Sequence, residues 1–220
     1  MKIRIAIDGP AGAGKSTIAK IISERLNIRY LDTGAMYRTV ALKAIRSGID
    51  TRDRSKISQL MENINLKVLF DKDTQRMYLD GEDVTDLIRS KEVSVGASDV
   101  AVILEVRLKL VELQREIARE NGIVMDGRDI GTYVLPDAEY KIFLTATPEE
   151  RAKRRYNEMI SKGVKDISLE AVKNDIEYRD KNDSTRKMAP LKKADDAVEI
   201  DTTNMSALEV AEKIISMIKG

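Results

Sequence analysis

Residues 9–16 constrain this chain more than any other part of the sequence. They read GPAGAGKS and fit the pattern G-x-x-x-x-G-K-[ST] without a mismatch. In such a loop, glycines let backbone N–H groups surround a polyphosphate, the lysine reaches the terminal phosphates, and the serine hydroxyl binds Mg²⁺. A largely apolar stretch at 3–8 precedes the loop, and apolar residues at helical spacing follow from Lys15.

This order of strand, loop and helix predicts a nucleotide-binding loop rather than an ordinary turn, because the N-terminus of the helix is directed at the phosphates. We therefore expect ATP phosphates to contact Gly9, Pro10, Ala11, Gly12, Ala13, Gly14, Lys15, Ser16 and Thr17, with Ser16 also binding Mg²⁺.

The composition limits the chemistry that can accompany this loop. The 220 residues include no cysteine and no histidine, which excludes a thiol nucleophile, disulfides and the usual neutral-pH base. Phosphoryl transfer suits the side chains that remain, because it depends mainly on positioning and charge neutralisation. The formal net charge of +1 gives no field that favours nucleic acid or a membrane. With no signal peptide or membrane-length apolar run evident, we expect a cytoplasmic monomer that binds neither nucleic acid nor membranes.

Strand-like and helical segments alternate along most of the chain. Strands are expected at 3–8, 28–31, 123–126, 140–144 and 197–201, and helices at 15–26, 34–47, 93–120, 148–162, 168–183 and 206–219. This alternation predicts an α/β fold with a mainly parallel sheet flanked by helices.

One segment interrupts that alternation. Apolar and polar residues alternate at 64–70 and again at 76–79, with a polar turn at 71–74 between them. Such a pattern is typical of an antiparallel hairpin. No crossover helix connects it to the neighbouring segments, so we favour a small inserted β module at about 62–90 over an edge hairpin of the main sheet.

A phosphate-binding loop alone leaves GTPase switches, motors and small-molecule kinases open. The guanine-reading pattern N-K-x-D and the pattern D-x-x-G are not found, and Asp126 is a single acid where a motor would carry an acidic pair. The segment LDTGAMYR at 31–38 offers a second anion site, in which a strand ends, Thr33 and Gly34 bend the chain, and a helix carries Arg38. The alternative is that Thr33 only caps the helix and Arg38 is solvated.

A further candidate site follows the strand at 123–126, at the sheet edge where α/β proteins bind ligands. In DGRDIGT, at 126–132, Arg128 can bind phosphate oxygens. Asp129 can accept a hydrogen bond from an exocyclic amine, as carboxylates do from cytosine N4. The alternative is a turn held together by an arginine–aspartate pair.

Taken together, four motifs resemble bacterial cytidylate kinases of the nucleoside monophosphate kinase family. They are DGPAGAGKST, LDTGAMYR, DGRDIGT and R-D-x-x-D-x-x-R-x-x-A-P-L, and the likeness spans nearly the whole chain. The resemblance implies a P-loop kinase that uses Mg²⁺ and ATP to phosphorylate CMP or dCMP. It also implies an acceptor-binding region at 33–100, which includes the β module, and a lid at 148–166.

The resemblance further implies roles for individual residues. The acceptor would contact Thr33, Arg38, Ser98, Arg107, Arg128, Asp129, Arg179, Asp183 and Arg186. Charge on the transferring phosphoryl group would be stabilised by Lys15, Arg38, Arg128, Arg151 and Arg155. Arg151, Arg154 and Arg155 share one face of the expected lid helix; the alternative is a solvated basic face.

Two spacings test this reading. Arg179, Asp183 and Arg186 are spaced to share one helix face if the helix runs that far. Ser98 and Arg107 are about half a turn out of phase on a straight helix, so either the helix breaks between Val100 and Val106 or one assignment is wrong.

Other acceptors and another class of protein remain open. A related kinase for UMP, AMP or shikimate, or a binding module controlled by its nucleotide state, would also contain a P-loop. Acceptor-dependent turnover distinguishes the kinases from the module. We also expect Asp129→Ala to weaken the preference for CMP more than the binding of ATP.

Overall fold

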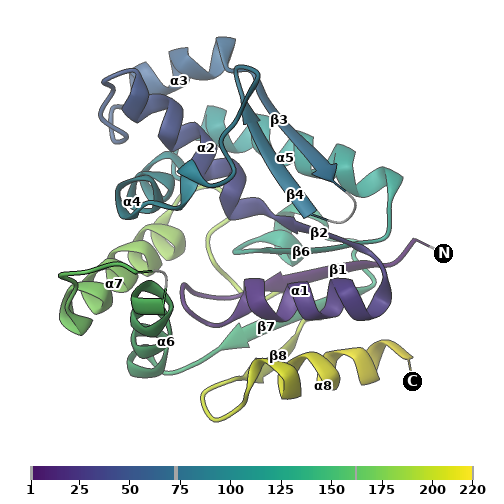
Figure 1. Ribbon diagram of the computed structural model, residues 1–220. Helices are drawn as coiled ribbons and strands as arrows, with labels where there is room; N and C mark the ends of the chain where they lie inside the picture. Colours follow the sequence, from purple (N-terminus) through teal and green to yellow (C-terminus); the bar gives the residue numbers. More distant parts are fainter. Residues whose placement is uncertain (1, 72–73, 162, 220) are drawn as a thin grey trace.

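The computed structural model describes residues 2–71, 74–161 and 163–219. Its centre is a five-stranded sheet in the order β2-β6-β1-β7-β8, and every neighbouring pair is parallel (Figure 1). The strands are β1 Arg4–Asp8, β2 Arg29–Asp32, β6 Ile123–Gly127, β7 Tyr140–Thr145 and β8 Val198–Asp201. The predicted α/β fold with a parallel sheet is therefore confirmed.

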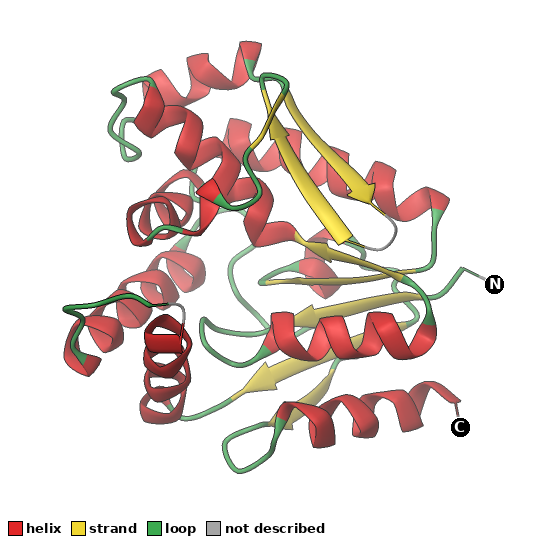
Figure 2. Cartoon of the chain, in the orientation of Figure 1, coloured by secondary structure: helices red, strands yellow, loops and turns green. Residues whose placement is uncertain are grey.

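Helices cover both faces of this sheet (Figure 2). The side chains of Ile5 and Ile7 in β1 pack into the core that contains α1 Lys15–Leu26 and α8 Ala207–Lys219. Ala6 faces the opposite core, beneath α2 Thr33–Arg46 and α5 Leu104–Glu120. Burial on both faces explains why the central strands β1 and β6 are largely apolar rather than alternating, whereas the edge strand β8 is mostly exposed.

The predicted β module is present as a separate antiparallel sheet, β3-β4-β5. Its strands are β3 Leu66–Asp71, β4 Thr74–Leu79 and β5 Glu82–Asp83. Two residues of the expected turn, 72 and 73, lie outside the described residues. A helix that the sequence analysis missed, α3 Arg54–Asn63, leads into the module, and the short helix η1 Leu87–Arg89 leaves it.

The helix predicted at 93–120 is wrong as a single element. The chain forms α4 Lys91–Val100, leaves the helical conformation at Ile103, and continues as α5. A straight helix would turn Val100 and Val106 to faces about 120° apart. The break buries both residues in one core, together with Ile103. Burial of three apolar side chains thus outweighs the continuity of the helix, although no proline or glycine marks the break.

The remaining helices include α6 Pro148–Ser161 and α7 Leu169–Thr185, which lie beyond the C-terminal ends of the strands (Figure 1). The π-helical turn η2 Ile130–Val134 instead bonds to Asp8 of β1 and to Arg115 of α5. The predicted end of α6, Lys162, lies outside the described residues. Because α7 ends at Thr185, Arg186 adopts an extended backbone and does not continue the helix. No helix within the described residues is long and apolar enough to cross a membrane.

Candidate active site

The P-loop turns between β1 and α1 with its glycines in conformations that other residues rarely adopt. Gly12 and Gly14 have φ angles of 78° and 86°. Gly9 has no space for a side chain, since a Cβ atom there would lie 2.1 Å from the carbonyl oxygen of Leu144. The loop therefore presents its backbone to the space in front of it, as the sequence predicts for a phosphate cradle.

Lys15 lies at the start of α1 with only 5% of its surface exposed. Its Nζ atom donates a hydrogen bond to the carbonyl oxygen of Pro10 at 2.7 Å. Burial, reinforced by the positive charge of Arg128, lowers the pKa of Lys15 to about 7. An anion in the cleft would favour the protonated amine, because opposite charge stabilises the charged form.

Asp126 is a functional candidate whose contacts the sequence analysis missed. It lies near the end of β6, beside β1, where its carboxylate accepts hydrogen bonds from Ser16 Oγ at 2.9 Å and Tyr30 OH at 2.7 Å. Burial, together with the charge of Asp32, raises its pKa above the usual range. Its position in the sheet could have indicated this role, since an acid at the end of the strand next to the P-loop strand often holds Mg²⁺ in P-loop proteins.

The side-chain oxygens of Ser16 and Asp126 are suitable ligands for a Mg²⁺ ion. Mg²⁺ takes oxygen ligands and is usually held by one or two protein groups, with water and substrate phosphates completing its shell. A hydroxyl and a carboxylate 2.9 Å apart beside the P-loop meet that description. Among the described residues no group of three or more acidic, cysteine or histidine side chains could hold a metal by itself.

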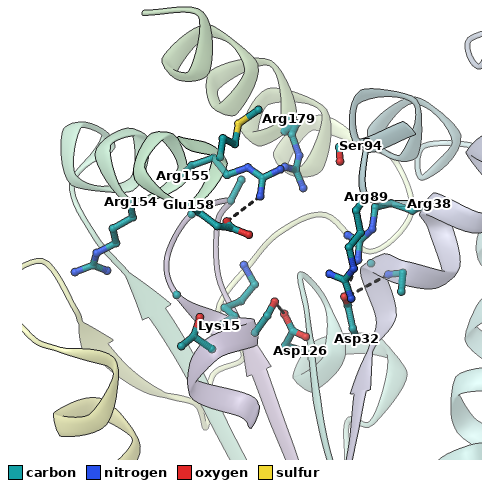
Figure 3. A pocket seen from close by; sticks show the side chains of 18 of the residues that line it. Lys15, Asp32, Arg38, Arg89, Ser94, Asp126, Arg154, Arg155, Glu158 and Arg179 are labelled. Carbon is teal, nitrogen blue, oxygen red and sulfur yellow. Dashed lines mark hydrogen bonds and ion pairs between the residues drawn. The ribbon is translucent and has the colours of Figure 1, made fainter. Parts of the chain in front are cut away.

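The segment at 31–38 forms the opposite wall. Asp32, and not Thr33, is the N-cap of α2: its Oδ1 accepts from the N–H of Ala35 at 3.0 Å. Thr33 donates to the carbonyl oxygen of Asp126 at 2.7 Å, which ties this wall to β6. Arg38 lies against Asp32 at 2.6 Å (Figure 3). Although burial opposes ionisation of Asp32, this ion pair lowers its pKa.

Asp129 lies in a buried set of ion pairs. Its two oxygens accept from Arg107 Nη2 at 2.5 Å and from Arg186 Nη2 at 2.8 Å. Beside it, Arg128 Nε donates to Asp183 at 2.7 Å. Residues from the turn after β6, from α5, from α7 and from the segment after α7 therefore meet at one point, although Arg186 lies beyond the end of its expected helix.

Ser98 and Arg107 lie on the two helices that the break separates. Ser98 lines the cleft and accepts a hydrogen bond from Asn182 Nδ2 at 3.2 Å. Arg107 is fully buried and lies behind Asp129, with Nη1 donating to Tyr37 OH at 3.2 Å. The expected break between Val100 and Val106 is present, so the two residues belong to separate helices and the phase of a single helix does not apply to them.

The lid arginines do not share one environment. Arg155 lines the cleft and pairs with Glu158 at 2.8 Å, whereas Arg154 donates to the carbonyl oxygen of Thr202 at 2.6 Å. The prediction that Arg151 faces the cleft is corrected: it is 7% exposed and lies behind the P-loop, bonded to Ala11 and Asp180. Residue spacing defines the face of a helix but not what that face meets.

Two further arginines point toward the cleft without an acidic partner at hydrogen-bond distance in the described parts of the chain. Arg179 has its pKa lowered to about 10 by burial and by the charge of Arg128. Arg89, from η1, lies beside Arg38 and Asp32 (Figure 3). Arg89 belongs to no motif, so only the fold could bring it to the site.

These residues line one cleft of about 2010 Å³. Most predicted site residues line it; those that do not are Gly9, Pro10, Ala13, Arg107 and Arg151. The cleft runs from the P-loop and the 202–206 loop, past the lid, to the walls formed by α2, α4 and the Arg128–Asp129 turn. Fold and cleft together define a P-loop nucleotide-binding protein with a second, arginine-rich side facing its phosphate loop.

Comparison with known proteins identifies the family to which the chain belongs. The family model described as cytidylate kinase matches residues 5–220, so the chain belongs to the cytidylate kinase family. It is 51% identical over 216 residues to a cytidylate kinase of Caldicellulosiruptor bescii, covering 98% of this chain and 95% of that protein. With a cytidylate kinase of Clostridioides difficile it shares 53% identity over 214 residues, or 97% of both chains.

Likeness to solved structures supports the fold alone. A crystal structure of an uncharacterized protein from Eubacterium ventriosum superposes with a TM-score of 0.55 at 15% identity, over 99% of both chains.

Proposed function

We propose that this protein transfers the γ-phosphoryl group of ATP to CMP or dCMP and releases ADP with CDP or dCDP. The observation that carries the proposal is the single cleft, in which the P-loop faces a second set of arginines from α2, η1, the Arg128–Asp129 turn and α7. Membership of the cytidylate kinase family supports CMP as the acceptor.

The donor side would hold ATP. Backbone N–H groups of the P-loop and the Lys15 amine would bind its phosphates, and Arg154 with the loop at 202–206 would lie beside its base. Mg²⁺, held by Ser16 and Asp126, would neutralise charge on the β- and γ-phosphates.

The acceptor side would hold CMP with its phosphate toward the P-loop. Arg38 and Arg128 would orient that phosphate, whose oxygen is the nucleophile. Such an oxygen is already ionised at neutral pH, since the second pKa of a phosphate monoester is about 6. The chain therefore needs no general base, which agrees with its lack of histidine. Arg155 and Arg179, across the cleft, would stabilise the phosphoryl group as it moves.

Asp129 would select cytosine over uracil. The amino group of cytosine donates a hydrogen bond, whereas the carbonyl group of uracil would place an oxygen against the carboxylate. Uracil would not leave this carboxylate unpaired, because Arg107 and Arg186 already donate to it. We therefore attribute the selection to repulsion of the uracil oxygen and to the fixed orientation of Asp129.

The predicted regions complete the proposal. The acceptor region at 33–100 and the lid at 148–166 would close over the two substrates, which excludes water and limits ATP hydrolysis. Gly163, with a φ of 80° and open space around it, would be a hinge for the lid.

A coupled ADP-release assay with Mg-ATP tests the proposal. Parallel reactions would contain CMP, dCMP, UMP, AMP, shikimate or no acceptor. We expect turnover with CMP or dCMP, its loss in Arg128→Ala, and its retention in Arg76→Ala, a half-buried arginine of the β module that does not line the cleft. Turnover with another acceptor would replace the proposed substrate, and equal slow turnover without any acceptor would indicate a nucleotide-dependent switch instead.

A further inference from the structure

Ala11, in the first half of the P-loop, is held by both of its backbone polar groups. Its N–H donates to Asp180 Oδ1 at 3.0 Å, and its carbonyl oxygen accepts from Arg151 Nη1 at 2.9 Å. Arg151 and Asp180 also pair with each other at 2.5 Å. We call these three residues the Ala11 clamp. It fixes the peptide groups immediately before the part of the loop that faces the phosphates.

The clamp belongs to the two helices that form the lid side of the cleft. Arg151 lies in α6 and Asp180 in α7, and Figure 1 shows both helices beside the loop between β1 and α1. The Ala11 side chain packs in a small apolar cluster with Val172 and Ile176 of α7. Gly12 lies against the same surface, since a Cβ atom there would be 2.9 Å from the carbonyl oxygen of Arg151.

Helix α7 also reaches the acceptor side. Arg179, the neighbour of Asp180, lines the cleft, and Asp183, one turn further on, pairs with Arg128 at 2.7 Å. One rigid helix therefore contacts the proposed acceptor site through two residues and the P-loop through a third. A ligand that fixes Arg179 and Asp183 also fixes Asp180, because all three belong to one helix.

We propose that Asp180 and Arg151 are positioning residues that couple the two sides of the cleft, so that an acceptor nucleotide bound against α7 raises the affinity of the P-loop for the donor nucleotide. This inference rests on the proposed function, since CMP is the acceptor. The Ala11 clamp forms only when α6 and α7 lie against Ala11. In that arrangement the backbone of the P-loop is fixed in the conformation that binds phosphates. Coupling of this kind is reciprocal, and the donor nucleotide must raise the affinity for CMP by the same factor.

Calorimetric titration of Mg-ADP, with and without saturating CMP, measures this coupling. ADP occupies the P-loop and has no γ-phosphate to transfer, so no reaction intervenes. We expect CMP to strengthen Mg-ADP binding by roughly fivefold or more in the unmodified protein, within the usual range of coupling between sites. In Asp180→Asn the amide NH₂ would face the donor group of Ala11 or of Arg151, and we expect the factor to fall below about twofold.

Glu177→Gln is the matched control. It makes the same change of a carboxylate to an amide in the same helix, at an exposed residue that pairs with nothing in the described chain. It should retain the full coupling factor. Arg151→Lys, which breaks the same clamp from α6, replaces Asp180→Asn if that variant does not fold.

The outcomes separate this inference from the proposed function. Coupling that survives in Asp180→Asn and Arg151→Lys, or that is absent from the unmodified protein although both nucleotides bind, would overturn the inference alone. A clamp with only a structural role would lower the thermal stability of the variants and leave the coupling factor unchanged. If CMP does not bind the unmodified protein, the proposed function fails and the inference with it.

Discussion

Asp8, the last residue of β1, joins the P-loop to the turn that carries Asp129. Its two carboxylate oxygens accept hydrogen bonds from the N–H groups of Ile130 and Gly131, both at 2.8 Å. Burial raises the pKa of Asp8 to about 7, against the opposing effect of these two N–H groups. Among nearby charges, Asp129 raises the pKa further and Lys15 lowers it.

This raised pKa predicts how Asp8 contributes to stability as pH changes. Between about pH 4 and pH 7 the native protein keeps a proton on Asp8 that the unfolded chain releases. The contribution of Asp8 to the free energy of unfolding therefore falls as pH rises through this window, by up to about 1.4 kcal/mol per pH unit, and is constant above it. Asp8→Asn removes the titrating group. We therefore compare the two free energies of unfolding, and the unmodified protein should lose stability relative to the variant from pH 5 to pH 7. Urea denaturation of both proteins measures the difference, and a value independent of pH would contradict the assignment.

Asp129 shows how the structure changes a prediction made from sequence. In Asp129→Ala, the fully buried Arg107 would lose its ion-pair partner, and such a loss costs about 3–5 kcal/mol of stability. We therefore expect this variant to unfold at lower urea concentration. A loss of stability would then be mixed with any change in selectivity. Asp129→Asn keeps one acceptor for the arginines and is the better test. Its ratio of kcat/KM for CMP over UMP should fall by roughly tenfold, while Mg-ADP affinity changes by less than about twofold. An unchanged ratio would mean that Asp129 does not select the base.

At the scale of single residues, the sequence predicts which side chains gather but not which of them face the ligand. The motifs identify Asp129 and Arg128 because they follow a buried strand, and the fold brings them to the cleft. Arg107 and Arg151 carry the same charge as residues that line the cleft, yet both are buried behind it. Their positions depend on contacts with Asp129 and Asp180, which are distant in sequence.

At the scale of elements, one side chain of the β module bonds directly to the backbone of Asp32, the residue that caps α2. Gln75 of β4 accepts from the N–H of Asp32 at 2.7 Å and donates to its carbonyl oxygen at 3.2 Å. These two bonds hold the residue that caps α2 and pairs with Arg38. The module therefore supports the acceptor site rather than lying apart from it.

Removing this support should weaken the acceptor site selectively. Each of the two hydrogen bonds is worth about 1 kcal/mol, so Gln75→Ala should raise the KM for CMP by up to roughly thirtyfold. The KM for ATP should change little, because Gln75 lies on the acceptor side of the cleft. Arg76→Ala is the control, since its half-buried side chain pairs with Asp83 within the module and does not contact Asp32. Equal effects of the two variants on CMP would show that general loosening of the module, and not the bonds to Asp32, is responsible.

The sequence predicts elements best where the periodicity is strong. The hairpin is evident because residues 64–70 and 76–79 alternate on both sides of a turn, and β3 and β4 pair in that way. Helix α3 is harder to detect because only Ile57 and Met61 are buried within it. The break between α4 and α5 has no local signal; the burial of Val100, Ile103 and Val106 in one core determines it.

Over the whole molecule, charge is nearly balanced, yet cations gather in the cleft. The formal net charge is +1, while the pKa values of Lys15 and Arg179 are lowered by burial and by the positive charge of Arg128. These groups repel one another within the ligand-free protein, because burial strengthens interactions between charges. Anionic ligands on either side of the cleft would relieve that repulsion and stabilise the native state.

Thermal unfolding in the presence of ligands tests this view of the cleft as one unit. A ligand at about one hundred times its Kd adds about 2.7 kcal/mol to the free energy of unfolding. For a chain of this size we expect that gain to raise the Tm by roughly 5–10 °C, for Mg-ADP and for CMP alike. Inorganic phosphate and UMP at the same concentration as CMP should give smaller shifts, because they relieve the repulsion without satisfying Asp129. A shift with CMP no larger than that with phosphate would show that the acceptor side recognises only charge. If the Ala11 clamp couples the two sides, Mg-ADP and CMP together should raise the Tm by more than the sum of their separate shifts, since each ligand then strengthens the binding of the other.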